Sequence, residues 1–499
     1  MKMICVPIMA RSNDEAAEKM ARAEKVADLV ELRVDFLPDP DLPRLVQNRS
    51  KPLIVTCRTP ENGGEFNLTP AHVGETEEER IGLLVEALRL GADFVDVEID
   101  APEESRRKVL DAAGSSERII LSSHNFDTTP DGLESLKDRM AAALPGAVLK
   151  IVTFARSVHD NLKVLSLLKN KKAGEKITAF CMGEHGETSR ILCPLFGGEF
   201  TFGALEAGQE TAPGQVPASV LKEVYRVNAL NRDTEIYGLI GNPVKESMGY
   251  LLHNKSYIKL GMNRVYLPFL VEDVAAFIRE FKSLCKGFSV TMPFKQDIIP
   301  LLDEVDPTAA KIGAVNTIDI RNGKLKGYNT DSSGAIQAVE SLTPLSGKTI
   351  FMIGAGGVAR AIGFGAIQKG ARIVLSDVDE ARAGKLAEEL GGKTCRREEW
   401  KDVNYDILVN CSPIGMHPKV EETPFPKEFL KAGTVVFDAV YNPLETRLLK
   451  EAAAAGCRTV RGVDLFINQA VAQFELWTGE KAPRDIMAEV VLERLKGNK

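Results

Sequence analysis

Eight short runs rich in β-branched and apolar residues recur through the first 205 residues, and amphipathic stretches separate them. The runs are residues 3–8, 29–35, 52–58, 93–99, 118–124, 147–155, 177–183 and 199–205. The stretches between them, such as 78–92 and 131–144, carry apolar residues at helical spacing. Strands joined by helical crossovers pair in parallel, and eight such strands can close into a (β/α)8 barrel. We therefore predict an α/β chain that opens with a barrel, with an open doubly wound sheet as the alternative.

The rest of the chain shows two further boundaries. Residues 211–220 carry two prolines and a glycine, a helix is expected over 218–230, and a new strand begins at Glu235. A second domain is therefore expected from about residue 234. A turn-rich segment at 341–348 precedes a strand, a glycine turn, a helix and a strand, which together predict a βαβ unit.

Composition excludes several classes of partner. The 499-residue chain has a formal net charge of -7, whereas a nucleic-acid-binding protein needs concentrated positive charge. No apolar stretch reaches 18 residues, and the first apolar run is too short for a signal peptide, so neither a membrane span nor secretion is expected. The eight cysteines form no CxxC pair, which favours reduced thiols in a cytoplasm over disulfides or a metal site. Oligomeric state stays open.

Charged and polar residues cluster near the ends of the predicted barrel strands. They are Glu31 and Arg33 in the second run, Arg58 and His124 ending the third and fifth, Lys150 within the sixth, and Arg190 and Gln215 after the last two. In a barrel these positions converge on the mouth formed by the strand C-termini, where such folds carry their chemistry.

Lys150 is the residue whose position predicts the most specific chemistry. Burial beside Val148 and Val152 would lower its pKa and supply a neutral amine, which can form an imine with a ketone and acidify the adjacent C–H. His124 could then take that proton, and Arg190, Arg33 or Arg58 could bind a carboxylate. The pattern alone leaves alternatives open. Lys150 could face outward or pair with Glu31, Glu31 could pair with Arg33, and His124 could be structural.

The ordered motifs ELRVD, TCR, SSHNF, VLKI, ETSR and APGQ resemble those of type I 3-dehydroquinate dehydratases over residues 3–230. The resemblance implies that Lys150 forms a Schiff base with the substrate ketone and that His124 is the general acid/base. It also implies substrate contacts, which fall on Glu31, Arg33, Arg58, Arg190, Thr211 and Gln215. Asn62 replaces a glutamate of the family that orients the histidine, so we expect a weaker proton affinity at His124. Thr211 replaces a serine and keeps its hydroxyl.

The GAGGVARA segment follows a predicted strand and opens a helix, which is the context expected of a dinucleotide-binding turn. The expected cofactor-binding positions are Gly354, Ala355, Gly356, Gly357, Val358 and Ala359. Asp377 ends the next strand, where an acidic residue binds the ribose hydroxyls of NAD and repels a 2′-phosphate, and Arg382 could offset that repulsion. A glycine turn without a ligand, and an exposed-loop role for Asp377, are the alternatives.

Lys295, Asn316 and Asp331 lie beside turns in 236–340, and the pattern alone favours unrelated surface charges. However, GFSVTMPFK, GAVNT, NTD, NCSPIGM and GVDLFINQA resemble the signatures of shikimate dehydrogenases over 236–480. The resemblance implies a substrate-binding domain (234–340 with 466–499), a Rossmann domain (341–465) and NADP, with no metal. It makes Lys295 and Asp331 the catalytic pair. It further implies substrate contacts at Ser247, Thr291, Asn316, Tyr441 and Gln469, and a cofactor contact at Gly462.

Two positions depart from this second family. Gly249 replaces a serine that is expected to hold the substrate carboxylate. Ser376, Asp377 and Val378 replace the asparagine, arginine and threonine that bind NADP, which leaves NAD possible.

The two resemblances name consecutive reactions. Dehydration of 3-dehydroquinate gives 3-dehydroshikimate, which the second half would reduce to shikimate. We therefore predict a cytoplasmic bifunctional enzyme acting on small molecules, with transfer of the intermediate between sites left open. One alternative is an NAD-dependent quinate/shikimate dehydrogenase in the second half. The other is a non-catalytic regulator, since some repressors of quinate use resemble inactive forms of these domains.

Overall fold

The computed structural model describes residues 3–66, 74 and 76–497. The chain divides into two compact units. Residues up to Thr234, together with Phe269–Glu272, form the first unit, and the remainder forms the second. Each unit contains its own sheets and its own buried core.

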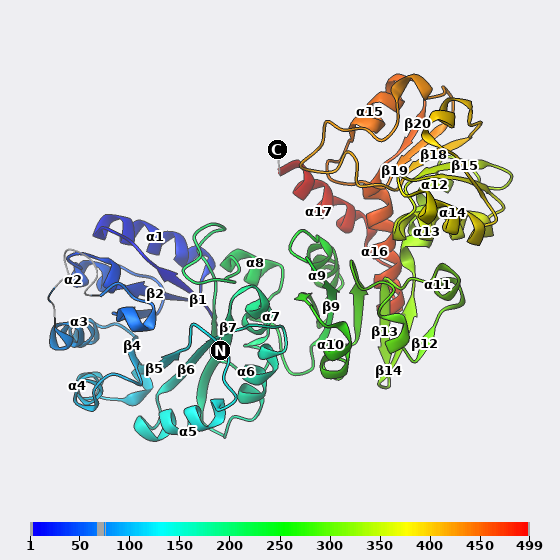
Figure 1. The fold of residues 1–499 in the computed structure, drawn as a ribbon. Coiled ribbons are helices and arrows are strands. Elements are labelled where there is room, and N and C mark those ends of the chain that lie inside the picture. Colours follow the sequence, from blue (N-terminus) through cyan, green and yellow to red (C-terminus); the bar gives the residue numbers. More distant parts are fainter. Residues whose placement is uncertain (1–2, 67–73, 75, 498–499) are drawn as a thin grey trace. The chain divides into compact units, whose positions relative to one another are not determined.

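The first unit consists of an eight-stranded parallel sheet with helices on its outer side (Figure 1). The strands are β1 (Met3–Ile8), β2 (Leu29–Arg33), β3 (Leu53–Thr56), β4 (Phe94–Glu98), β5 (Ile119–His124), β6 (Val148–Phe154), β7 (Lys176–Met182) and β8 (Phe200–Phe202). The helices are α1 (Asn13–Val26), α2 (Leu42–Gln47), α3 (Glu77–Arg89), α4 (Glu103–Ala113), α5 (Leu133–Ala143), α6 (Asp160–Lys169), α7 (Glu187–Leu192) and α8 (Ala218–Glu223). All eight predicted strands are therefore present.

The eight strands curl into a nearly closed barrel. Their order is β7-β6-β5-β4-β3-β2-β1-β8, and β1 pairs with β8 through Met3 opposite Phe200. On the other side of β8, Thr178 Oγ1 donates to Phe200 O at 3.1 Å, and Glu199 N donates to Ile177 O at 3.0 Å. The predicted barrel is confirmed, and the open-sheet alternative is wrong. Because all the strands are parallel, their C-termini surround one mouth.

One predicted helix is shorter than expected. We expected a helix over 218–230, but α8 ends at Glu223. Arg226 has a φ of 52°, in the left-handed region that a right-handed helix does not contain. The chain therefore leaves the helix there and reaches residue 234 through turns and irregular segments.

The second unit contains two sheets, the first of them mixed. Its order is β10-β9-β11-β13-β14-β12, and β11 runs parallel to β9 and antiparallel to β13. The strands are β9 (Glu235–Gly241), β10 (Arg264–Leu270), β11 (Gly287–Val290), β12 (Glu304–Val305), β13 (Thr317–Arg321) and β14 (Lys324–Tyr328). The helices of this segment are α9 (Gly249–Lys259), α10 (Val274–Phe281), α11 (Pro307–Ile312) and α12 (Thr330–Glu340).

The second sheet of this unit is fully parallel, in the order β17-β16-β15-β18-β19-β20. Its strands are β15 (Thr349–Ile353), β16 (Arg372–Ser376), β17 (Lys393–Thr394), β18 (Ile407–Asn410), β19 (Val435–Asp438) and β20 (Arg458–Val460). The remaining helices are α13 (Gly357–Gln368), α14 (Glu380–Glu389), α15 (Arg447–Ala454), α16 (Gly462–Thr478) and α17 (Arg484–Gly497). Alternate residues of β15 enter different cores: Met352 packs with α13 and α14, and Phe351 packs with Trp400 and α15. The sheet is therefore covered on both faces, and α16 packs against α12.

Within the described ranges, no helix is long and apolar enough to cross a membrane. The same residues contain no group of three or more His, Cys, Asp or Glu side chains arranged to hold a metal ion. All eight cysteines are free, and Cys5 and Cys57 are buried in the barrel unit.

Candidate active sites

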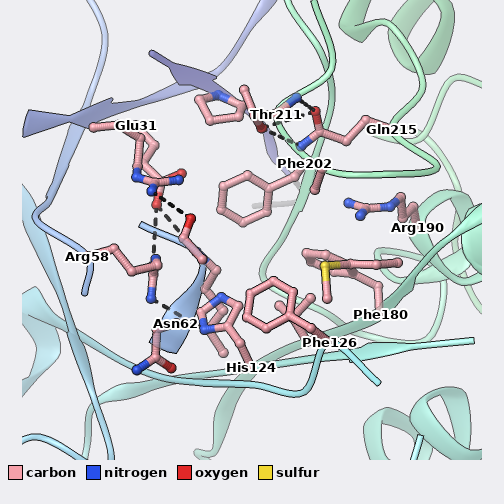
Figure 2. Close-up of a pocket in the computed structure, with 17 residues that line it drawn as sticks. Glu31, Arg58, Asn62, His124, Phe126, Phe180, Arg190, Phe202, Thr211 and Gln215 are labelled. Carbon is pink, nitrogen blue, oxygen red and sulfur yellow. Dashed lines mark hydrogen bonds and ion pairs between the residues drawn. The ribbon is translucent and has the colours of Figure 1, made fainter. Parts of the chain in front are cut away.

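The C-terminal mouth of the barrel contains a pocket with about 490 Å³ of empty space, part of it open to solvent (Figure 2). Every residue singled out from the sequence of this half lines it: Glu31, Arg33, Arg58, Asn62, His124, Lys150, Arg190, Thr211 and Gln215. Phe126, Phe180 and Phe202 add aromatic walls. The fold thus brings residues of six strands and their following loops into one pocket.

Lys150 projects from the middle of β6 into this pocket, with 6% of its side chain exposed. Its Nζ donates to Asp96 Oδ2 at 3.0 Å and to Glu31 Oε1 at 3.3 Å, and lies 4.3 Å from the ring centroid of Phe202. The expectation that valine-sized residues surround this amine is therefore wrong, because β2 and β4 turn carboxylates inward. The ion pair with Glu31, one of the alternatives, is present, but it lies inside the pocket.

Arg58 follows β3 and links several buried polar groups. Its NH2 donates to Asp96 Oδ2 at 2.8 Å, and its NH1 donates to Ser122 Oγ at 3.1 Å. Ser122 Oγ in turn donates to Asp96 Oδ1 at 2.6 Å. Burial would raise the pKa of Asp96, but the charges of Arg58 and Lys150 hold that pKa well below its ordinary value. Asp96 is therefore a fixed negative charge beside the amine.

His124 ends β5, and its Nδ1 lies 3.3 Å from Arg58 NH1 (Figure 2). A guanidinium can only donate, so Nδ1 accepts, and the neutral ring carries its proton on Nε2. Burial, followed by the charges of Arg58 and Lys150, lowers the pKa of His124 well below 6.5. Phe126 stacks on the ring at a centroid distance of 6.0 Å. The histidine is thus a neutral group held in one orientation.

Asn62 occupies the position where the resemblance implied a carboxylate. Its Nδ2 donates to Thr59 Oγ1 at 3.3 Å, within its own loop. The loop is tight, because a Cβ at Gly64 would lie 1.9 Å from Arg58 O. Arg58, and not residue 62, therefore supplies the hydrogen bond to His124.

Two arginines of the pocket, Arg33 and Arg190, differ in whether a carboxylate pairs with them. Arg33 pairs with Asp35 through two hydrogen bonds of 2.8 and 2.7 Å. Arg190 is 1% exposed, and its Nε has no hydrogen-bond partner among the described residues. Its guanidinium lies 4.6 Å from the Phe180 ring centroid, and NH2 donates to Pro213 O at 3.4 Å. Burial lowers the pKa of Arg190 from 12.5 to about 10. This uncompensated cation is suited to an anionic ligand.

The loop after β8 is held by its own side chains. Gln215 Oε1 accepts from Thr211 N at 2.8 Å, and Gln215 Nε2 donates to Thr211 Oγ1 at 2.9 Å. The two side chains therefore present polar atoms to the pocket as one unit.

Sequence reasoning missed the acidic residues of β4. Asp96 and Glu98 are 0% and 2% exposed, and both belong to the charged network around Lys150. Their spacing of two was an available signal, because alternate residues of a barrel strand point inward. Sequence alone did not show which alternate set faces the interior.

In the second unit, Lys295 and Asp331 form a direct pair. Nζ lies 2.5 Å from Oδ2, and the side chains are 24% and 14% exposed. Lys295 follows β11, whereas Asp331 lies in the first turn of α12, which Asn329 caps by accepting from Ser332 N at 3.1 Å. They are therefore not unrelated surface charges but one half-buried acid/base pair.

Asn316 is buried immediately beside this pair. Its Nδ2 donates to Thr330 Oγ1 at 3.0 Å, and its Oδ1 accepts from Thr330 N at 2.7 Å. The amide thereby holds the start of the helix that carries Asp331. Thr291 lies against Gly241, where an added Cβ would be 2.2 Å from its methyl group.

The remaining predicted substrate residues of this unit lie in the segment between β9 and α9, on α16 and in the loop after β19. Ser247 Oγ accepts from Gly249 N at 3.2 Å. A Cβ at Gly249 would lie 3.2 Å from Tyr266 OH and 3.4 Å from Ser247 Oγ, so a serine there would add its hydroxyl beside Ser247. Tyr441 stacks on Phe466 at 4.9 Å, and Gln469 Nε2 donates to Phe466 O at 2.8 Å.

The glycine turn between β15 and α13 fits a dinucleotide pyrophosphate. Gly354 has a φ of 102°, and an added Cβ would meet Cys411 at 2.9 Å. Above Gly356 and Gly357, in contrast, an added Cβ would meet nothing within 4 Å, so a ligand has access to the backbone. The first turn of α13 offers unpaired N–H groups there, including those of Val358 and of Ala359, whose methyl is buried. Gly462 packs against Val440 O, which an added Cβ would approach to 2.4 Å.

Asp377 lies at the end of β16 beside this turn, with 5% of its side chain exposed. Oδ2 accepts from Ala355 N at 2.6 Å, and Oδ1 accepts from Asp379 N at 2.9 Å. Arg382 NH2 donates to both oxygens, at 2.8 and 2.9 Å. Burial opposes ionisation, but these hydrogen bonds lower the pKa of Asp377. The positive charge of Arg382 is therefore already neutralised by its ion pair with Asp377.

Comparisons with known proteins cover both units. A family model of type I 3-dehydroquinase matches residues 4–232. The model of the shikimate dehydrogenase substrate binding domain matches residues 239–318, and that of the shikimate 5'-dehydrogenase C-terminal domain matches residues 462–492.

Curated relatives and solved structures agree with these matches. The chain is 38% identical to the chloroplastic bifunctional 3-dehydroquinate dehydratase/shikimate dehydrogenase of Arabidopsis thaliana, over 98% of this chain and 84% of that protein. It is 40% identical to a shikimate dehydrogenase (NADP(+)) of Bacillus cereus, over 53% of this chain and 99% of that protein. A crystal structure of shikimate dehydrogenase from Aquifex aeolicus matches with a TM-score of 0.50 and 36% identity, covering 52% of this chain and 99% of that one. Quinate dehydrogenase from Corynebacterium glutamicum in complex with NAD matches with a TM-score of 0.50 and 32% identity over the same shares.

Proposed function

The chain belongs to the family of bifunctional 3-dehydroquinate dehydratase/shikimate dehydrogenases, and from this premise we propose how its residues divide the two reactions. The protein is a lyase and an oxidoreductase on one chain. It dehydrates 3-dehydroquinate to 3-dehydroshikimate and reduces that product to shikimate. We assign the first reaction to the barrel and the second to the unit that follows it.

In the barrel, Lys150 forms a Schiff base with the ketone of 3-dehydroquinate. The C=N bond forms as the carbonyl oxygen leaves in water, and the resulting iminium withdraws electrons from the neighbouring C–H bond. The iminium has the same charge as the lysine ammonium. Asp96 and Glu31, at 3.0 and 3.3 Å from Nζ, therefore stabilise the intermediate as they stabilise the resting side chain.

His124 moves the proton. It takes the proton from the acidified carbon and delivers it to the departing hydroxyl, so that one water leaves, and hydrolysis of the imine then releases 3-dehydroshikimate and Lys150. Accepting a proton at Nε2 requires the proton of the ring to sit on Nδ1, to which Arg58 donates in the substrate-free protein. Since Arg58 also lines the pocket, it turns its NH1 toward the bound substrate and frees Nδ1.

The observation that carries this assignment is the Arg190 guanidinium, which lies in the same pocket as Lys150, forms no ion pair with the described residues and has an Nε without a hydrogen-bond partner among them. The substrate carboxylate supplies the negative charge that Arg190 lacks. Arg33 is already paired with Asp35, which leaves it to contact hydroxyl groups. Thr211 and Gln215 complete the substrate contacts.

Trapping tests this reaction. Borohydride added with 3-dehydroquinate reduces the imine and adds the mass of the substrate skeleton to the peptide that contains Lys150. Lys150→Ala removes the adduct and the dehydratase activity, while reduction of 3-dehydroshikimate by the same preparation continues and shows that the chain is folded. Full dehydratase activity in Lys150→Ala would refute the imine mechanism.

In the second unit, Lys295 and Asp331 act together on the oxygen of the reacting carbon. When bound, a reduced nicotinamide cofactor supplies the hydride. Lys295 donates a hydrogen bond to the carbonyl oxygen and passes it a proton, and Asp331 orients Lys295 across their 2.5 Å contact. Ser247, Thr291, Asn316, Tyr441 and Gln469 hold the rest of the substrate, with Asn316 acting through the start of α12.

The cofactor binds the glycine turn at Gly354–Gly357, with Gly462 close by. NADP is the cofactor in the name of the Bacillus cereus relative, and the quinate dehydrogenase structure contains NAD. Asp377 favours NAD here, because a carboxylate with 5% of its side chain exposed lies where a 2′-phosphate would bring further negative charge. Comparing kcat/KM for NADPH and NADH tests this, and a strong NADPH preference contradicts the role given to Asp377.

Quinate is a second candidate substrate of the same site. Gly249 lacks the hydroxyl that a serine would place beside Ser247, so the site holds the acid with one hydrogen bond fewer and discriminates less between shikimate and quinate. Measuring the oxidation rates of shikimate and of quinate, each with NAD and with NADP, shows which of the two acids is the better substrate.

We also propose a domain division and a location for the chain. We propose a barrel over 1–230, a substrate domain over 234–340 and 466–499, and a Rossmann domain over 341–465. The separate sheets β9–β14 and β15–β20 support the latter two. Eight free cysteines support a cytoplasmic location.

A further inference from the structure

Arg80 is a buried arginine that lies outside the pocket. It belongs to α3, whose start is fixed by a capping box between Thr76 and Glu79, and only 1% of it is exposed. Its NH1 donates to Cys57 O at 2.6 Å and to Glu98 Oε2 at 2.9 Å. Its Nε and NH2 donate to Glu77 at 2.7 and 3.0 Å. Substrate binding does not account for this side chain, because Arg80 does not line the pocket.

Glu98 connects Arg80 to the pocket. Its Oε2 faces Arg80, and its Oε1 accepts from Arg58 NH1 at 3.3 Å. Burial raises the pKa of Glu98, and the charges of Arg58 and Arg80 oppose that rise. The charge of Glu98 therefore depends on both arginines being present.

Arg58 NH1 is shared among three acceptors. They are Glu98 Oε1 at 3.3 Å, Ser122 Oγ at 3.1 Å and His124 Nδ1 at 3.3 Å. In the substrate-free protein NH1 is equally close to Glu98 and to the ring. An ionised carboxylate is a stronger acceptor than a hydroxyl or a neutral imidazole, so once substrate binding loosens the contact with His124, Glu98 holds NH1 away from Nδ1. If Glu98 were neutral, NH1 would stay on Nδ1 and would keep the proton of the ring on Nε2, where the substrate needs a lone pair.

We propose that Arg80 is a positioning residue of the dehydratase: by pairing with Glu98 it holds Arg58 so that His124 is free to take a proton. The inference rests on the proposed role of His124 in the barrel. It also explains how His124 can work without a carboxylate at position 62: Glu98 acts on the ring indirectly, through Arg58.

Among the described residues, the charged and titratable groups around Glu98 come from its own strand and from neighbouring elements of the barrel. Arg80 faces it from α3, with Glu77 bonded to the other side of that guanidinium. Cys57 and Arg58 face it from the loop after β3, Asp96 from its own strand, and His124 from β5 through Arg58. The pKa of Cys57 is raised well above its ordinary value by burial, so this thiol stays neutral. Arg80 also pairs with Glu77, but the Glu77 side chain is 35% exposed, so Glu98 is the buried carboxyl whose ionisation depends on Arg80.

The test is the pH profile of dehydratase kcat/KM for Arg80→Gln. Without Arg80, Glu98 takes up a proton at higher pH, so the acidic limb of the profile moves to higher pH. We expect about a tenfold loss at pH 6 and less than a twofold loss at pH 8. Glu98→Gln imitates the protonated carboxyl at every pH. Its kcat/KM should therefore be about tenfold below that of the unmodified protein at every pH, without the acidic limb that Arg80→Gln shows. The double variant is no worse than Glu98→Gln alone, because both changes act through one group.

Glu77→Gln is the matched control. It removes an ion pair of Arg80 whose acidic partner is 35% exposed and leaves the pair with Glu98 intact, so its profile should overlay that of the unmodified protein. If Arg80→Gln does not fold, Arg80→Lys, which keeps the charge beside Glu98, should restore the profile, and Glu98→Gln still shows whether that carboxyl titrates. Reduction of 3-dehydroshikimate by the same samples reports intact protein.

Two results would overturn the inference: an equal loss at all pH values in Arg80→Gln, or the same shift in Glu77→Gln. An unmodified protein that forms no borohydride adduct at Lys150 would instead overturn the proposed dehydratase mechanism, so the two failures are distinguishable.

Discussion

Arg190 offers a test in which stability and activity move in opposite directions. Its guanidinium is buried in the barrel pocket without a carboxylate, and its Nε has no partner in the described part of the chain. We expect Arg190→Met to make the barrel more stable and to weaken binding of 3-dehydroquinate. Methionine has a similar length and keeps apolar contact with the Phe180 ring that the guanidinium now covers.

The pKa of Arg190 sets the magnitude. Burial lowers it from 12.5 to about 10, which corresponds to about 3 kcal/mol by which the fold disfavours the charged form. Because the folded pKa is the lower one, this cost is fully present below about pH 10 and fades as the pH rises toward 12.5. At neutral pH, removing the charge should therefore raise the free energy of unfolding by about 1–3 kcal/mol. Loss of a charge-assisted hydrogen bond to the substrate, at about 1.5–3 kcal/mol, should raise KM by about 10- to 100-fold.

The assay must report on the barrel alone. Both tryptophans, Trp400 and Trp477, lie in the second unit, so their fluorescence during urea unfolding serves as an internal control that should not change. Hydrogen exchange of β6 peptides follows the barrel itself. Arg190→Lys keeps the charge and should show no such gain. A barrel destabilised by more than 1 kcal/mol in Arg190→Met, or an unchanged KM, would refute the view that this cation is held uncompensated for the substrate.

Three further predictions concern the second unit. Asp331→Asn should lower kcat for reduction of 3-dehydroshikimate by about 10²-fold or more, since Lys295 loses its 2.5 Å partner, while dehydratase activity measured on the same sample stays unchanged. Gly249→Ser should lower KM for shikimate several-fold, because it adds a hydroxyl beside Ser247. Steady-state kinetics measure this, and an unchanged KM would contradict the role of this position. Asp377→Asn should raise the ratio of kcat/KM for NADPH to that for NADH by about tenfold, or ~1.4 kcal/mol, because it removes a negative charge beside the 2′-position. An unaltered ratio would show that Asp377 only holds the turn at Ala355.

The positions of the barrel strands were predictable because their signal is local. Each run of β-branched residues and each amphipathic stretch reports its own burial, and a count of eight strands separated by crossovers leaves few topologies. The helix expected over 218–230 shows the limit of this reasoning. Its apolar spacing continues past Glu223, but the left-handed backbone at Arg226 ends the helix, and no periodicity predicts that conformation.

The surroundings of Lys150 were not predictable from its neighbours in sequence. Val148 and Val152 suggested an apolar environment, whereas the groups that contact Nζ are Asp96, Glu31 and Phe202, from three other strands. Their arrival depends on the stagger of the barrel, which fixes which alternate residues face inward.

By itself, the sequence determined the fold class, the order of the elements, the glycine turn at 354–357 and the identity of most groups that do chemistry, because these depend on residue type and short-range spacing. Only the tertiary structure decided which charges meet. It paired Lys295 with Asp331, left Arg190 Nε without a partner among the described residues, and buried Arg80 against Glu98 on a helix whose charged residues would ordinarily face water. Electrostatic partners are set by distances of a few ångströms between residues far apart along the chain, and no local pattern encodes those distances.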